Sequence, residues 1–387
     1  MCNLINVMAS KRIFDNTEIA FQLKNDSELE RAYFLFKMIS HQPLVRIGTA
    51  ATNFALKTNL PVEGLIRSTV FDHFCGGVNE NDCLSVVENM YEKGVSSVLD
   101  FSVEGKEDEN EFDAAMEKTC LLIEFAHEQE SMPIAVFKPT GFGRFHLYEK
   151  KGSSEELSSE ESKEWDRVVA RFDKVCKLGE EKGVEILIDA EESWMQDAAD
   201  DLVEDMMRLY NREDVIVYNT LQTYRWDRIN YLTEIHKRSL VDGFKTGFKI
   251  VRGAYMEKER LRAEKLGYAS PICTDKVATD ENFNASLFYI LGHLNDISLF
   301  IGTHNEESSY LAMQLMESLH IAKNDNRVWF GQLYGMSDHI SFNLADHGYN
   351  VAKYVPFGPV KDVMPYLIRR AEENTSVAGQ TNRELKL

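Results

Sequence analysis

Two adjacent arginines near the C-terminus, Arg369 and Arg370, are the side chains of this sequence best suited to hold a small anion. A guanidinium group offers rigid, bidentate donors that match a carboxylate. Neighbours on a helix project about 100° apart, and Glu373 follows the two arginines by four and three residues. The same spacing also fits a surface ladder of Arg–Glu pairs. Spacing alone leaves both a carboxylate clamp and a surface ladder open.

A second chemical feature is a row of polar side chains at the ends of eight β-rich runs. Taken singly, each such residue is ordinarily a loop charge or a helix cap. Taken together, they predict a polar mouth of mixed charge that suits a small charged ligand. The residues at or near these ends are Asp100, Lys138, Asp189, Gln222, Arg252, Tyr255, His304, Asn305, Gln332 and Tyr354.

The elements that would position these residues follow a repeating pattern. Eight β-rich runs begin at residues 96, 134, 184, 215, 248, 297, 327 and 350, and amphipathic helical stretches lie between them. Such alternation over roughly 290 residues favours a (β/α)₈ barrel over an open doubly wound sheet. An open sheet that binds a dinucleotide should carry GxGxxG after its first strand, and the sequence has none. In a barrel, the active site lies at the C-terminal ends of the strands.

The chain is divided into an N-terminal helical segment over 1–90 and a barrel over 91–387. Ser27 and Glu30 have the spacing of a capping box, which places a helix start there. Leu29, Tyr33, Phe36 and Ile39 would share its buried face. Residues 45–60 and 82–94 show similar helical spacing, and a Ser/Glu-rich run from 151 predicts a loop leading into a helix. After the eighth strand, a helix can start at Pro359, and Pro365 should kink it or shift its start.

Composition excludes several classes of function. The formal charge is 43 − 63 = −20, and such a field repels nucleic acid. The six cysteines include no CxxC pair and no metal-ligand spacing, so we expect reduced thiols and no metal. No run of 18 apolar residues spans a membrane, and the first residues resemble neither a signal nor a transit peptide. We therefore expect a cytoplasmic location.

At this point the order of motifs becomes specific. FKPTGFGR, LIDAEES, KIVRGAY, THN, GQLYGM and YVPFGPVKDVMPYLIRRAEEN occur in this order between about residues 90 and 376, and together they resemble the proline dehydrogenase family. The RGAYM form is closer to the monofunctional, eukaryotic-like branch than to bifunctional enzymes, which typically show KGAYW. No aldehyde dehydrogenase module is expected, since the sequence ends at Leu387. The resemblance implies a distorted (β/α)₈ barrel whose last helix lies over the barrel mouth.

The resemblance also implies roles for individual residues. In the family, the pair at Arg369 and Arg370 binds the proline carboxylate, the position of Lys138 contacts substrate, and Asp189 pairs with the second arginine. Residues that match the walls of the proline ring are Tyr255, Leu333, Tyr354 and Tyr366. Positions that match flavin contacts are Gln222, Lys249, Val251, Gly253, Ala254, Thr279, His304, Asn305 and Glu373. Many bacterial members have Arg in place of Lys249, which weakens that one match because Lys lacks the fork geometry.

The implied reaction is oxidation of L-proline to Δ1-pyrroline-5-carboxylate by FAD, with a quinone reoxidising the flavin. A quinone acceptor implies peripheral contact with a bacterial inner membrane, and the product implies a downstream pyrroline-5-carboxylate dehydrogenase. The bulk of Tyr354 favours proline over hydroxyproline, whose dehydrogenase is the rival function within the family. Outside the family, the residues leave open a Schiff-base barrel lyase with Lys138 as nucleophile and a barrel kept as a regulatory binding module.

Overall fold

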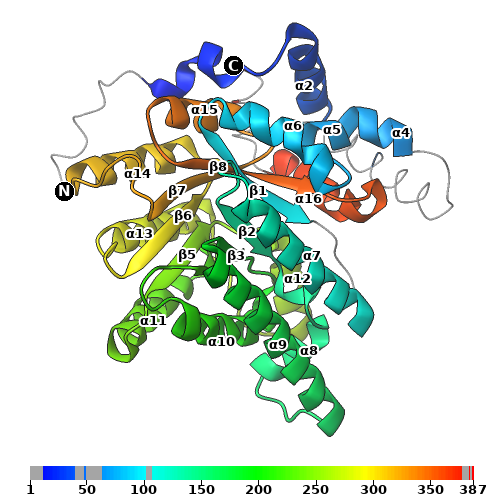
Figure 1. Cartoon of the computed structure of the whole chain (residues 1–387), viewed down its shortest axis with the longest axis vertical. Helices are drawn as coiled ribbons and strands as arrows, with labels where there is room; N and C mark the ends of the chain where they lie inside the picture. The colour runs from blue at the N-terminus through cyan, green and yellow to red at the C-terminus, as the bar shows by residue number, and fades with distance from the viewer. Residues whose placement is uncertain (1–11, 40–47, 49–62, 102–106, 377–382, 384–385) are drawn as a thin grey trace.

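Eight parallel strands form the centre of the computed structural model, which describes residues 12–39, 48, 63–101, 107–376, 383 and 386–387 (Figure 1). Their hydrogen-bonded order is β1-β8-β7-β6-β5-β4-β3-β2. The predicted eight strands and the (β/α)₈ barrel are confirmed. The strands are β1 (Val95–Phe101), β2 (Ile134–Phe137), β3 (Glu185–Ile188), β4 (Val217–Gln222), β5 (Thr246–Val251), β6 (Ile297–Gly302), β7 (Val328–Leu333) and β8 (Val351–Phe357).

The two ends of this sheet meet between β1 and β2. No strand ladder joins these two strands, both of which lie within the described residues. Instead, the amide of Ser97 in β1 donates to the carbonyl of Ser131, just before β2, over 2.8 Å. The barrel is therefore closed here by a single backbone contact and by side chains.

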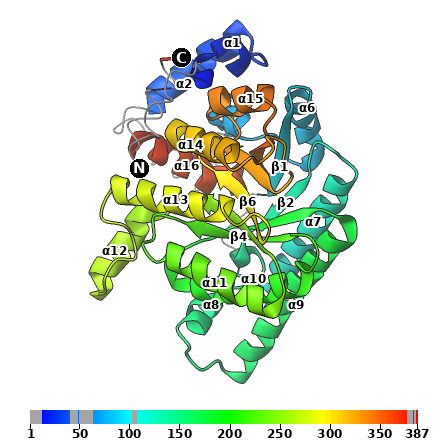
Figure 2. The same ribbon diagram turned by 90° about the vertical axis from the view of Figure 1, so that its left-hand side faces the viewer.

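Helices follow the strands and surround the barrel (Figures 1 and 2). The Ser/Glu-rich run leads into α9, as predicted, through a reciprocal capping box between Ser158 and Glu161. The helix ends at Gly183, whose φ of +66° is the left-handed conformation that favours glycine. The helices of the barrel are α7 (Glu109–His127), α8 (Phe145–Gly152), α9 (Ser159–Lys182), α10 (Ser193–Tyr210), α11 (Arg228–Asp242), α12 (Met256–Leu266), α13 (Lys276–Leu291), α14 (Glu306–Ser318), α15 (Asp338–Asp346) and α16 (Val360–Ser376).

The N-terminal segment is helical, as predicted, but two details differ. The helix α2 begins at Asp26, and its capping box is formed by Asn25 and Glu28, whose side chains accept from each other's backbone amides over 3.0 and 2.9 Å. Ser27 and Glu30 share the same spacing but lie inside the helix. The buried face consists of Ala32, Leu35, Phe36 and Ile39, whereas Tyr33 is 53% exposed. Apart from Gly48, the stretch 45–60 lies outside the described residues.

The other described elements of this segment are short, except for the helix that leads into the barrel. The helix α6 covers most of the predicted stretch 82–94. These elements are, in chain order, η2 (Ile13–Asp15), α1 (Thr17–Ala20), α4 (Glu63–Ile66), the π-helix η3 (Arg67–Phe71), α5 (Asp72–Phe74) and α6 (Glu80–Tyr91).

The last helix, α16, packs against this N-terminal segment. Val363 and Leu367 of α16 are buried in a cluster with Phe36 of α2 and Phe71 of η3. Figure 1 shows α16 beside the ends of β1 and β8, among the N-terminal helices. The helix begins at Val360, one residue after Pro359, and it contains Pro365. The prediction that the last helix lies over the barrel mouth agrees with this packing.

The barrel interior has its own apolar cluster. It contains alternate residues of the strands, among them Val98, Val136, Leu187, Phe300 and Ala352. Because side chains alternate across a strand, residues two positions further along point into the same interior. This register decides which polar residues reach the mouth.

Two further features bear on location and redox state. Within the described ranges, no helix is both long enough and apolar enough to cross a membrane. The five cysteines that the structure describes are free, and four of them are buried.

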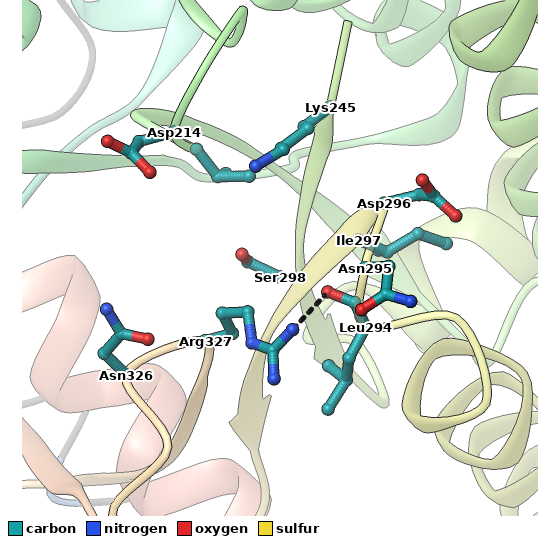
Figure 3. Close-up of a pocket in the computed structure, with 10 residues that line it drawn as sticks. Asp214, Lys245, Leu294, Asn295, Asp296, Ile297, Ser298, Asn326 and Arg327 are labelled. Carbon is teal, nitrogen blue, oxygen red and sulfur yellow. Dashed lines mark hydrogen bonds between the residues drawn. The ribbon is translucent and has the colours of Figure 1, made fainter.

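The opposite, N-terminal end of the barrel holds a cavity of about 270 Å³ (Figure 3). Its walls include Lys245, Ser298 and Arg327, which lie at the starts of β5, β6 and β7. The Arg327 guanidinium is held by the carboxylate of Asp325 and by the carbonyl of Leu294 over 3.2 Å. These groups serve local structure, and this face of a (β/α)₈ barrel ordinarily serves stability. The cavity is therefore separate from the predicted active site.

Glu185, at the start of β3, is the titratable group for which we expect the clearest effect on stability. The residue is half-buried, but its Oε2 atom is buried and has no hydrogen-bond partner within the described part of the chain. Burial raises the pKa of Glu185 to about 8, and a hydrogen bond from Tyr218 opposes this rise. The folded state thus binds this proton more tightly than the unfolded chain does, so the stabilisation is complete below about pH 4.5 and is lost as the pH rises through about 8.

We expect Glu185→Gln to remove this loss. The variant should melt close to the wild type near pH 5 and about 3 °C or more above it near pH 8.5, as followed by circular dichroism. A difference in melting temperature that stays constant across this range would contradict the raised pKa.

Candidate active site

Three charged residues continue the interior face of the first three strands. Asp100, Lys138 and Asp189 each stand two residues beyond an interior side chain, namely Val98, Val136 and Leu187. They therefore point into the barrel at its C-terminal end. The structure brings together the predicted residues Lys138 and Asp189, and it adds Asp100 as their neighbour.

The Lys138 ammonium lies between two carboxylates. Its Nζ atom is 3.1 and 3.4 Å from the two Oδ atoms of Asp100 and 3.7 Å from Oδ2 of Asp189. All three side chains are largely buried. An ammonium between two carboxylates is strongly favoured over a free amine, so this geometry argues against Lys138 as the nucleophile of a Schiff-base lyase.

Lys249 completes this cluster from β5. Its Nζ atom donates to Asp189 Oδ1 and, over 2.9 Å, to the hydroxyl of Tyr354. Burial raises the pKa of Tyr354 well above its ordinary value, and the negative charges of Asp189 and then Asp100 raise this pKa further. Tyr354 is therefore a neutral wall of the mouth, held in place by Lys249.

The contacts of Asp189 differ from one prediction. Within the described residues its partners are Lys138 and Lys249, and the expected pairing with Arg370 is not formed. The Arg370 guanidinium lies 5.2 Å from the ring centre of Tyr366, one turn earlier on α16, so it is directed along its own helix. Two lysines within reach of one carboxylate satisfy its charge without the arginine.

The arginine pair sits on α16 at the edge of this mouth. Arg370 is buried and Arg369 is half-buried. Burial first, then Lys353, and then the charge of Arg370 lower the pKa of the His304 imidazole, which places Arg370 near His304. A surface Arg–Glu ladder would leave both arginines exposed, so their burial favours the clamp over the ladder. The side chain of Glu373 lies outside the described residues.

The main chain just after β5 is exposed and could be reached by a ligand. Gly253 and Ala254 are exposed, and Val251 and Tyr255 are half-buried. Gly253 has a φ of +128°, and a Cβ atom there would lie 2.6 Å from the ring of Tyr224. Only glycine fits this backbone.

Gln222 and Thr279, two further predicted flavin contacts, are buried and make local hydrogen bonds. The Gln222 amide donates to the carbonyl of Glu191 over 2.6 Å, and the Thr279 hydroxyl donates to the carbonyl of Asp275 over 3.1 Å. The Gln222 bond fixes its side chain between β4 and the loop after β3. The bond of Thr279 is internal to the start of α13.

His304 and Asn305 follow β6. Nδ1 of His304 lies 2.9 Å from Oγ of Ser337, which leaves Nε2 as the ring nitrogen that can bind a ligand. Burial, then Lys353 and Arg370, lower the pKa of His304 to about 3. The imidazole is therefore neutral at pH 7, although part of its side chain remains exposed. Oδ1 of Asn305 caps α14 by accepting from the amide of Ser308 over 2.9 Å.

These groups fit the ring system of a flavin. The nitrogen and oxygen atoms of such a ring need hydrogen-bond donors and acceptors. The flat ring also needs a stretch of main chain that it can approach without meeting bulky side chains. The open backbone at Gly253 and Ala254, the neutral His304 and the Lys249 ammonium supply both. The residues are thus chemically suited to hold this cofactor.

Some residues of the mouth were assigned no role from the sequence. Asp100, the partner of Lys138, stood out only as a polar strand end. Glu191 accepts from the amide and hydroxyl of Thr140 over 3.1 and 2.7 Å, and burial raises the pKa of Glu191 to about 7. Arg252, just after β5, is bound instead by Asp280, Thr303 and Ser308 over 2.7, 2.8 and 3.0 Å, so it joins the loops that follow β5 and β6 to the helices α13 and α14.

Known proteins share the fold and much of the sequence of this chain. The structure of proline utilization A (PutA) from Bdellovibrio bacteriovorus, inactivated by N-propargylglycine, superposes with a TM-score of 0.73 at 20% identity. It covers 98% of this chain, which spans 41% of that protein. At this identity the likeness establishes the fold, which is the (β/α)₈ barrel of PutA.

The sequence matches the family model described as proline dehydrogenase over residues 83–383. Proline dehydrogenase 1, mitochondrial, of Dictyostelium discoideum is 31% identical over 95% of this chain and 72% of its own length. The carbapenem antibiotics biosynthesis protein CarD of Pectobacterium carotovorum subsp. carotovorum is 38% identical over 84% of each chain. The fold and the charged mouth thus define a barrel enzyme that acts on a small ligand. The chain belongs to the proline dehydrogenase family, whose members act on proline.

Proposed function

We propose that this chain oxidises L-proline to Δ1-pyrroline-5-carboxylate with FAD as its bound cofactor, and that the electrons pass to a quinone. The observation that carries the proposal is the pair of the half-buried Arg369 and the buried Arg370 on a helix beside a mouth lined by Lys138, Asp189 and Lys249. A small zwitterion with a carboxylate and a ring nitrogen matches a site with both cationic and anionic groups. The family match supports the same substrate.

The residues of this chain orient the substrate. The two guanidinium groups would hold the carboxylate, which fixes which face of the proline ring meets the cofactor. Tyr354, Leu333, Tyr255 and Tyr366 would wall the ring. Tyr354 is buried and its hydroxyl is held by Lys249, so it leaves little room for a hydroxyl on the substrate ring. This geometry favours proline over hydroxyproline.

Gln222, Lys249, Val251, Gly253, Ala254, Thr279, His304, Asn305 and Glu373 are the proposed cofactor positions. A flavin bound there would supply the hydride acceptor for the carbon next to the ring nitrogen. Proline enters as a zwitterion, so its ring nitrogen must lose one proton before the hydride leaves and a second proton for the neutral imine to form. Asp189 and Lys138 would set the local charge around that nitrogen.

The partners follow from this reaction. A quinone lies in a membrane, so the proposal requires peripheral contact of the protein with a membrane, which in a bacterium would be the inner membrane. The product would be consumed by a pyrroline-5-carboxylate dehydrogenase. The net charge of −20 argues against nucleic acid as a partner.

The visible spectrum tests cofactor and substrate together. The purified protein should show an oxidised flavin band that bleaches on anaerobic addition of L-proline and returns with a soluble quinone analogue. Hydroxyproline at the same concentration should bleach it at least about ten-fold more slowly, because one poorly accommodated group costs about 1–3 kcal/mol. A colourless protein, or a flavin band that proline leaves unchanged, would reject the proposal.

A further inference from the structure

The loop between β7 and α15, residues 334–337, contacts the proposed site at both ends. Leu333, the last residue of β7, is a proposed wall of the proline ring. At the other end, Oγ of Ser337 lies 2.9 Å from Nδ1 of His304, a proposed cofactor position. Any shift of this loop would therefore move both a substrate wall and the orientation of His304.

The backbone of this loop is strained and needs outside support. Gly335 has a φ of +76°, and a Cβ atom on it would lie 2.1 Å from the carbonyl oxygen of His73. Ser337 has a φ of +52°, which is unfavourable for a residue with a side chain. Such conformations persist only where the surroundings fix them. One support is His73 itself, whose Nε2 atom lies 2.9 Å from the Gly335 carbonyl.

The second support is a buried lysine on β8. The Lys353 side chain is 1% exposed, and its Nζ atom donates to the carbonyls of Met336 and Leu333 over 2.7 and 3.3 Å. It also lies 2.8 Å from Oδ1 of Asp338, the first residue of α15. One ammonium group thus holds the start, the middle and the end of the loop.

The other oxygen of Asp338 is bound from the N-terminal segment. Nζ of Lys24, between α1 and α2, donates to Oδ2 of Asp338. Burial alone would raise the pKa of Asp338, but Lys24 and then Lys353 hold that pKa well below its ordinary range. A buried carboxylate shared by two lysines depends on both, because an ion left with fewer partners in the interior is costly.

The N-terminal segment has further anchors that do not involve Lys24. Nδ2 of Asn343 on α15 donates to the carbonyl of Asn16 over 3.1 Å, and the amide of Phe14 donates to the hydroxyl of Tyr310 over 3.2 Å. Figure 2 shows α1 next to α15. Loss of the Lys24 charge would therefore leave the segment docked and affect the loop selectively.

We propose that Lys24 is a positioning residue for the active site: through Asp338 and Lys353 it fixes residues 333–338, and with them Leu333 and His304, in the geometry that binds proline. This role rests on the proposed function, because Leu333 and His304 are proposed site residues. It gives the N-terminal helices a part in binding, although they lie outside the barrel.

The test compares Lys24→Met and Lys24→Arg with a matched control, Lys150→Met. Lys150 is 20% exposed and pairs with Glu161 over 2.8 Å, and Lys24 is 24% exposed, but the Lys150 pair joins α8 to α9 away from the loop. Two readouts are needed. The first is hydrogen–deuterium exchange of the peptide that covers 333–338, measured without proline. The second is KM and kcat for proline in the flavin-loaded enzyme.

Lys24→Met should exchange about ten-fold faster than the wild type in this peptide, and its KM should rise about ten-fold with kcat changed less than about three-fold. Lys24→Arg should restore both values, and Lys150→Met should leave both at wild-type levels. If Lys24→Met does not fold, Lys24→Gln carries the same expectations.

Faster exchange throughout the protein, or a Lys24→Met variant that matches Lys150→Met in both readouts, would overturn the role of Lys24. A wild-type enzyme whose flavin is not reduced by proline would instead overturn the proposed function. In that case, selective exchange in 333–338 would still show that Lys24 fixes the loop, whereas its part in proline binding would fall with the function.

Discussion

Replacing Arg370 with methionine is expected to lower kcat/KM for proline about 100-fold, mostly through KM, while the protein keeps its flavin. Removing one partner of a buried, hydrogen-bonded charge pair costs about 2–5 kcal/mol, and about 1.4 kcal/mol corresponds to a factor of ten. Arg370 is buried on α16, so the bound carboxylate would lose a desolvated and pre-positioned donor. Arg370→Lys should lose less, about ten-fold, because an ammonium keeps the charge without the fork.

Steady-state kinetics, together with the flavin-to-protein absorbance ratio, measure this effect. Arg167→Met is the matched control, since Arg167 forms an exposed pair with Glu109 over 2.7 Å on the outside of the barrel. It should leave both quantities unchanged. An Arg370→Lys variant with normal proline kinetics would show that this arginine is not part of a carboxylate clamp.

Lys138→Met is expected to have the second large effect, a loss of about 100-fold or more in kcat/KM together with a lower melting temperature. Without the ammonium, the carboxylates of Asp100 and Asp189 face each other in a largely buried site with one cation fewer. Uncompensated buried charge is strongly destabilising. The substrate would at the same time lose a cationic contact.

The double variant Lys138→Met with Asp100→Asn separates these two causes. Removing one of the facing charges should restore much of the melting temperature but little of kcat/KM, if Lys138 contacts the substrate. Lys237→Met, at an exposed pair with Glu234 on α11, is the control for loss of a lysine. Recovery of both quantities in the double variant would assign Lys138 a purely structural role.

The sequence predicted most of the barrel, because its elements are long and strongly patterned. Each of the eight β-rich runs became a strand, since runs such as ISLFIG are apolar, β-branched and bounded by turn residues. The cap of α2 was misplaced for a specific reason. Asn25 with Glu28 and Ser27 with Glu30 have the same spacing, and the choice depends on which residue leaves the helical backbone.

The composition of the site was predictable, but its pairings were not. Strand ends placed Lys138 and Asp189 at the mouth, because the carboxyl ends of parallel strands meet there. The pairing of Asp189 with Lys249 rather than with Arg370 depends on how α16 is oriented, which spacing along the chain does not encode. The contact of Lys24 with Asp338 joins residues 314 positions apart, and no local pattern marks such a pair.

The closure between β1 and β2 has a consequence for how this barrel responds to a bound ligand. Seven of the eight joints in the wall are backbone ladders, whereas the eighth has one backbone hydrogen bond and side-chain contacts, which include the Lys138–Asp100 ion pair above it. That pair is largely buried, so salt screens it little, but a substrate that contacts Lys138 would compete for the same ammonium. Occupancy of the substrate site would therefore change the strength of the one joint that lacks a ladder.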